Sequence, residues 1–167
     1  PGTPVENVKA DLLAGIDWAI QRSRQGNLRV LNLSVGADSS ESYLVDPLAR
    51  AARSAGAAGL VVIAAAGNYG VDAAGRKVYG SIASPGHDPS VITVGAANPF
   101  GTPGRGDDLV TRFSSRGPTR GASTFASGRR SADNLIKPDL VAPGNRLVGP
   151  MSSDGSGKRS GWNFIAR

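Results

Sequence analysis

The sequence predicts an α/β fold in three layers, in which a parallel sheet carries helices on both faces. Apolar runs of strand length alternate with longer helical patterns through the first hundred residues. The runs at residues 60–66 and 91–94 are almost continuously apolar, as expected for strands buried on both faces of a parallel sheet. Successive strand, helix and strand segments at this spacing imply right-handed crossover connections.

The first helix is expected over residues 3–25. Thr3 fits the N-cap, Pro4 the first helical position, and Glu6 completes a Thr-x-x-Glu capping box. A single apolar stripe at helical spacing runs along it, formed by Val5, Val8, Leu12, Ile16 and Ile20. Gly26 supplies the C-terminal stop.

A strand at residues 28–33 is expected next, followed by a second helix. This helix opens at Asp46 and Pro47 and runs to about residue 55. Its close-packing face is made of small side chains, namely Ala51, Ala52 and Ala55. Gly56 and Gly59 are expected to end it.

The composition changes after about residue 99. Residues 101–135 are rich in Gly, Ser, Thr and Arg, which predicts long surface loops with one short strand-like stretch at 109–113. A last strand is expected at 139–142 and a mobile tail at 151–161. The sequence thus predicts a single partial domain over residues 1–167, with a core at 1–100, loops at 101–135, and the last strand and tail at 136–167.

Charge and composition exclude several classes of partner. Residues 101–167 carry 11 Lys and Arg against 5 Asp and Glu, whereas residues 1–100 carry 8 of each. The basic residues are scattered without interleaved aromatics, so we expect solvated loops and no nucleic-acid partner. No apolar run reaches the roughly 18 residues that span a bilayer, so no membrane partner is expected. With no Cys, disulfides and thiolate metal sites are excluded.

The run at residues 61–68 carries the clearest sign of chemistry. It is a strand that ends in small residues and then delivers a single amide side chain, that of Asn68. An amide with no bulk around it suits the donor of an oxyanion hole beside a substrate cleft. The alternative is that Asn68, which follows Gly67, is a turn residue in a left-handed conformation.

Four segments in order resemble the subtilisin-like serine proteases, or subtilases: LNLSVG at residues 31–36, AAAGN at 64–68, SPG at 84–86 running into VITVGA at 91–96, and FSSRGP at 113–118 followed by KPDLVAPG at 137–144. The resemblance covers roughly residues 5–148. It implies a partial subtilisin-like fold, peptide-bond hydrolysis through an acyl-enzyme, and an extracellular or cell-surface location. Calcium is common in the family, but no carboxylate cluster here has convincing ligand spacing, so no cofactor is evident.

The resemblance also assigns roles to single residues. Asn68 matches the oxyanion-hole Asn. Ser34, Val35 and Gly36 match one wall of the family's substrate pocket, and Ala65, Ala66 and Gly67 match the opposite wall. Ala83 matches a position near the floor of that pocket. The residues themselves fit a peptide or protein substrate, because an exposed strand end at 34–36 can add an extended peptide by backbone hydrogen bonds. Ser34 could instead be purely structural.

The groups that should react are not in the sequence. Serine hydrolysis needs a nucleophile, a base and an orienting carboxylate, but the chain has no Asp-(Ser/Thr)-Gly, no His-Gly-Thr and no Gly-Thr-Ser segment. Its single His, His87, is expected to be a solvent-facing loop residue. We therefore expect an internal fragment of an endopeptidase, inactive alone and lacking parts of its own catalytic domain.

Two further expectations follow from that interpretation. A sheet without its flanking strands should expose apolar edges, which predicts self-association or a loosely ordered terminus. The competing hypothesis is a non-catalytic peptide-binding module that never had the triad. A nucleotide-binding function is poorly supported, because no Gly-x-Gly-x-x-Gly or phosphate-binding loop is present.

Overall fold

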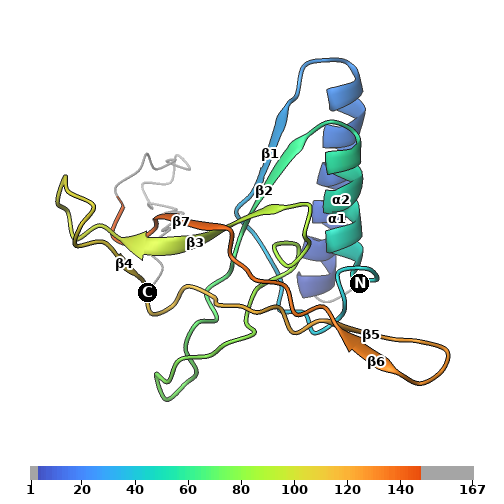
Figure 1. Cartoon of the computed structure of the whole chain (residues 1–167). Coiled ribbons are helices and arrows are strands. Elements are labelled where there is room, and N and C mark those ends of the chain that lie inside the picture. Colours follow the sequence, from blue (N-terminus) through green and yellow to red (C-terminus); the bar gives the residue numbers. More distant parts are fainter. Residues whose placement is uncertain (1–3, 148–167) are drawn as a thin grey trace.

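The computed structural model of the chain describes residues 4–147, with the backbone alone described for residues 4–7. Two helices and seven strands occur in this part of the chain (Figure 1). In order they are α1 (Pro4–Arg24), β1 (Val30–Leu33), α2 (Pro47–Ala57), β2 (Val61–Ala65), β3 (Ile92–Asn98), β4 (Leu109–Val110), β5 (Ala122–Thr124), β6 (Arg130–Ala132) and β7 (Leu140–Pro143).

The main sheet is parallel except for one short strand. β1 pairs with β2 and β2 with β3, in a register that aligns Leu33 with Ala64 and Ala65 with Val94. β7 pairs in parallel with β3, and β4 pairs antiparallel with the last residues of β3. The α/β class and the parallel sheet are therefore confirmed.

Both described helices cover the same face of this sheet. α1 and α2 lie side by side (Figure 1), and their side chains join those of the strands in one apolar core. That core consists of Ile16, Ala19, Leu33, Ala52, Ala55, Leu60, Val62, Ala64 and Val91. Within residues 4–147 no helix covers the opposite face, so the helices found there form one of the two expected outer layers.

α1 matches the expected helix closely at its C-terminal end. Gly26 has a φ of 78°, the left-handed conformation that stops a helix. Ile16 is buried, but Val8 is 55% exposed, so only the second half of the predicted apolar stripe reaches the core. The predicted cap at Thr3 lies outside the described residues, as do the side chains of Val5 and Glu6.

α2 begins as expected, at a capped and buried N-terminus. The carboxylate of Asp46 accepts the backbone N–H of Ala49 at 2.9 Å, and Pro47 occupies the first turn. Ala52 and Ala55 are completely buried, and their small size lets the helix pack closely against α1 and β2. The helix continues through Gly56 to Ala57, slightly beyond the predicted end.

The expectation that β2 is buried on both faces is wrong. Val62 and Ala64 are buried against the helices, whereas Val61, on the other face, is 48% exposed. The strand looks continuously apolar in sequence, yet only one of its faces has a helix over it in the described part of the chain.

The region expected to be loops contains a small hairpin. β5 and β6 pair antiparallel and stand apart from the main sheet (Figure 1). Their side chains are mostly polar and show no alternation, so no sequence pattern marks them as strands. Of the strand-like stretch predicted at 109–113, only Leu109–Val110 forms a strand, β4. The predicted mobile tail lies outside the described residues.

Neither described helix is long and apolar enough to cross a membrane.

Replacing Asp46 with Ala should destabilise the fold by roughly 2–3 kcal/mol. The change removes the N-cap of α2 and leaves the buried hydroxyl of Ser84, which donates to Asp46 at 2.7 Å, without its acceptor. Urea unfolding measures the loss. Asp46→Asn keeps an acceptor oxygen and should lose clearly less, and equal losses for the two variants would contradict this account.

Candidate functional site

The predicted site residues follow two neighbouring parallel strands. Ser34, Val35 and Gly36 come directly after β1, and Ala66, Gly67 and Asn68 come directly after β2. Parallel neighbours end at the same edge of a sheet, and ligands bind characteristically outside the carboxyl ends of such strands. Residues 34–36 and Asn68 are exposed at this edge.

A cavity of about 500 Å³ lies beside this edge. Its lining includes Ser34 from the first segment and Ala65, Ala66, Gly67 and Asn68 from the second. Val35, Gly36 and Ala83 are not part of the lining. The structure therefore brings five of the eight predicted site residues to one cavity.

Ala83 lies behind the cavity, between the two glycines. Its side chain is buried, and its N–H donates to the carbonyl of Ala66 at 2.8 Å. A Cβ atom placed on Gly36 would lie 3.1 Å from the Ala83 Cβ, and one placed on Gly67 would lie 3.0 Å from it. The three residues thus converge, and any larger side chain at positions 36 or 67 would push the segments apart.

The segment that carries Ala83 joins the two predicted walls, residues 34–36 and 65–67, through the backbone. Ser84 and Ala37 form an antiparallel bridge, with N–H to O distances of 2.9 and 3.0 Å. Together with the bond from Ala83 to Ala66, this bridge fixes residues 34–37 relative to residues 65–68. All of residues 81–88 are buried, which makes this loop part of the interior of the protein.

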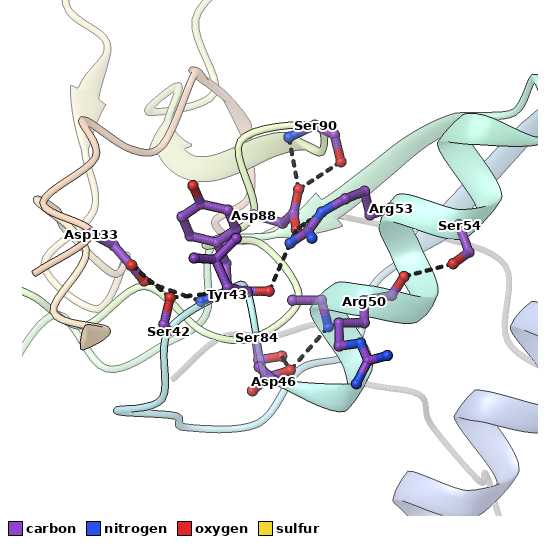
Figure 2. Close-up of polar contacts among 12 residues, drawn as sticks. Ser42, Tyr43, Asp46, Arg50, Arg53, Ser54, Ser84, Asp88, Ser90 and Asp133 are labelled. Carbon is purple, nitrogen blue, oxygen red and sulfur yellow. Dashed lines mark hydrogen bonds and ion pairs between the residues drawn. The ribbon is translucent and has the colours of Figure 1, made fainter. Parts of the chain in front are cut away.

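Two carboxylates hold the buried segment against α2 (Figure 2). Asp46 accepts the hydroxyl of Ser84, and Asp88 accepts the Arg53 guanidinium at 3.0 and 2.6 Å. Arg53 also donates to the carbonyl of Tyr43 at 2.7 Å. Burial by itself would raise the pKa of Asp46, but hydrogen bonds from Ser84, Ala49 and Ser39 outweigh it and hold this pKa below the ordinary 3.8.

The expectation that His87 faces solvent is wrong. The residue is 3% exposed, and neither ring nitrogen has a hydrogen-bond partner in the part of the chain that the structure describes. Burial lowers the pKa of His87 below 6.5 and outweighs the opposing effect of the Asp46, Asp133 and Asp88 carboxylates. The imidazole is therefore neutral near pH 7 and is buried within the segment 81–88.

The remaining cavity residues were not predicted. They come from β1, β2, β3 and β7, several of them on the face of the sheet that the helices leave open, and from Phe113 and the chain after β7: Asn32, Ile63, Ala64, Val94, Gly95, Ala96, Phe113, Ala142, Pro143, Gly144 and Leu147. Asn32 donates to the Ser34 hydroxyl at 3.1 Å. Its position as a polar residue within an apolar strand is the one sequence signal that could have pointed to this face.

Among residues 4–147, no group of three or more His, Asp or Glu side chains is arranged to hold a metal ion.

Comparison with known proteins gives one consistent result. A sequence profile of the subtilase family matches residues 6–164. Serine protease AprX of Bacillus subtilis is 38% identical over 83% of this chain, and subtilisin-like protease SBT6.1 of Arabidopsis thaliana is 30% identical over 81%. The chain spans 28% and 11% of these two relatives, and therefore only a minor part of each.

Solved structures support the same similarity at the level of the fold. Sphericase superposes with a TM-score of 0.56 at 27% identity, and the S41 psychrophilic protease with 0.54 at 31%. Each covers 81% of this chain, while this chain covers 38% of each of them.

The neutral state of His87 predicts a specific pH dependence of stability. Because the pKa of His87 is lower in the folded protein, the unfolded chain takes up this proton first as the pH falls. The contribution of neutral His87 to stability is complete above pH 6.5 and is lost as the pH falls from 6.5 toward the folded pKa. His87→Gln removes the titrating group and with it this pH dependence. The free energy of unfolding of the variant should therefore fall less steeply below pH 6.5 than that of the wild type.

Urea unfolding at a series of pH values gives both curves. The diagnostic window lies between pH 6.5 and about pH 5, because Asp46, Asp72 and Asp139, whose pKa values are lowered from 3.8, add their own pH dependence of stability below about pH 5. Parallel curves in this window would show that His87 does not titrate there differently in the two states.

Proposed function

The chain belongs to the subtilase family, and we propose that it supplies the substrate walls and the oxyanion donor of a serine endopeptidase cleft. The observation that carries the proposal is the convergence of Ser34 with residues 65–68 on one cavity at the carboxyl ends of β1 and β2. Asn68 is the exposed polar residue that follows the end of β2.

Asn68 acts on the charge that develops during acyl transfer. When a nucleophile attacks the scissile carbonyl, its oxygen becomes negative, and a fixed amide N–H stabilises that charge more than it stabilises the neutral substrate. Asn68 fits this role because small residues precede it and leave its amide accessible.

Substrate binding falls to the two walls. The exposed backbone at residues 34–36 can pair with an extended peptide, which adds main-chain hydrogen bonds regardless of sequence. A side chain of that peptide would enter between residues 34–36 and 65–67, over Ala83. None of these wall residues carries a charge or a large side chain, so the pocket places few polar demands on the side chain that it accepts.

In this proposal, the nucleophile, the base and the orienting carboxylate come from parts of the protein outside these 167 residues, because the sequence contains none of the three triad motifs. The protein as a whole acts outside the cell on peptide or protein substrates. The alternative is a peptide-binding module of the same fold without a triad. The presence or absence of the triad motifs in the complete gene distinguishes the two.

Asn68→Ala in the complete protein should lower kcat on a peptide substrate by about 10²- to 10³-fold with little change in KM, because the interaction exists mainly in the transition state. This factor is the one known for subtilisin, a protease of this family. Steady-state kinetics measure it.

Asn98→Ala is the matched control, since Asn98 is also an amide at a strand end but does not line the cavity. This control should keep kcat within about two-fold. Equal loss in both variants, or a loss in KM alone, would contradict the oxyanion role of Asn68.

The 167-residue chain alone should show no peptidase turnover and no labelling by a fluorophosphonate probe, because it contains no Ser, His and Asp set with triad motifs. Labelling is measured against a denatured sample of the same chain. Labelling of the folded chain above that background would overturn the assignment of the triad to other parts of the protein.

A further inference from the structure

We propose that Ser115 is a positioning residue that fixes the direction of the Asn68 amide. This inference rests on the oxyanion role proposed for Asn68 and extends it to a residue in the FSSRGP segment, far away in the sequence. Ser115 does not line the cavity and acts only through Asn68.

Ser115 holds the turn on both sides of Asn68. Its backbone N–H donates to the carbonyl of Gly67 at 2.9 Å, and its hydroxyl oxygen accepts the backbone N–H of Tyr69 at 3.0 Å. The residue is 1% exposed, so neither bond competes with solvent. Two hydrogen bonds to one buried residue thus enclose Asn68 and leave its own side chain exposed.

The turn lies directly against the Ser115 hydroxyl. Gly67 has a φ of 101°, in the left-handed region that favours glycine. A Cβ atom placed there would lie 2.9 Å from the Ser115 Oγ and 3.2 Å from the Tyr69 Cδ2. Gly67 is therefore needed for this close approach as well as for its φ.

Ser115 is itself held in place by its neighbour Arg116. The guanidinium of Arg116 donates to four backbone carbonyls, all within 3.2 Å: those of Gly70, Arg112, Ser114 and Thr111. The backbone of Arg116 also pairs with Ser81, whose N–H donates to the Arg116 carbonyl at 2.9 Å. These contacts connect Ser115 to the buried segment behind the cavity.

The direction of an oxyanion donor decides its effect. Stabilisation of the transition state requires the N–H to be aimed in advance, within a fraction of an ångström, at the position of the developing charge. The side chain of Asn68 is exposed, so the backbone at residues 67–69 is what fixes the Cα–Cβ direction from which its amide reaches. Without the hydrogen bond between Tyr69 and Ser115, this backbone could move. The Asn68 amide would still be present, but it would be held less precisely in the direction of the developing charge.

The test is Ser115→Ala in the complete protein, assayed on a peptide substrate. We expect kcat to fall about five-fold, the factor that corresponds to one hydrogen bond of ordinary strength, while KM stays within about two-fold. In the Asn68→Ala background the same substitution should have no further effect on kcat, because there is no amide left to position.

Ser114→Ala is the matched control. Ser114 is equally buried, and its hydroxyl accepts the N–H of Ala96 in β3 at 3.0 Å and not a backbone group of residues 67–69. This variant should lose comparable stability and keep kcat. If kcat falls by the same factor in both serine variants, the role of Ser115 is merely structural and the proposal is overturned. An unchanged kcat for Ser115→Ala would overturn it as well.

Amide exchange of Tyr69 separates this inference from the proposed function. In Ser115→Ala the exchange of the Tyr69 N–H should accelerate, and in Ser114→Ala it should not, whatever the catalytic activity. If Asn68→Ala leaves kcat unchanged, the oxyanion role fails and the positioning proposal fails with it. If Asn68→Ala is impaired but Ser115→Ala lowers kcat by the same factor in both backgrounds, only the positioning proposal is overturned.

Discussion

The backbone hydrogen bonds of Ala83 and Ser84 are the constraint on which the candidate cleft depends. Through them the segment after β1 and the segment after β2 are held at one separation, although no direct strand pairing joins residues 34–37 to residues 66–68. This explains why residues 81–88 are buried and why two carboxylates, Asp46 and Asp88, tie them to α2. The N-terminus of α2 and one wall of the proposed substrate cleft are thereby parts of one hydrogen-bonded unit.

Small residues are the second requirement of the same arrangement. Gly36 and Gly67 each approach Ala83 so closely that an added methyl group on either would lie about 3 Å from the Ala83 Cβ. Packing at this distance leaves little room for a larger side chain, so residue size limits how closely the two segments approach Ala83. The FSSRGP segment adds a third side to the unit, because Ser115 contacts the Gly67 turn and Arg116 bonds to the segment behind it.

Much of this could be predicted from the sequence, and the failures have physical causes. The N-cap of α2 and the glycine that ends α1 are local sequence signals, and the structure has both as predicted. The one-sided burial of β2 depends on which helices cover the sheet, which an apolar run cannot indicate. His87 was expected to face solvent because it lies in a loop rich in Gly and Pro; it does lie in that loop, but tertiary contacts bury the whole segment. The part played by Ser115 depends on two hydrogen bonds that span almost fifty positions, and no local pattern encodes them.

The central claim is that Asn68 and residues 34–36 face the same bound peptide. A crystal structure of the complete protein with a peptide boronic acid, which mimics the tetrahedral intermediate, tests it most directly. The account predicts that the Asn68 Nδ2 lies within hydrogen-bond distance of a boronate oxygen and that the peptide pairs with the backbone at residues 34–36. A boronate whose oxygens are bound elsewhere, or a peptide that lies along another edge of the sheet, would contradict it.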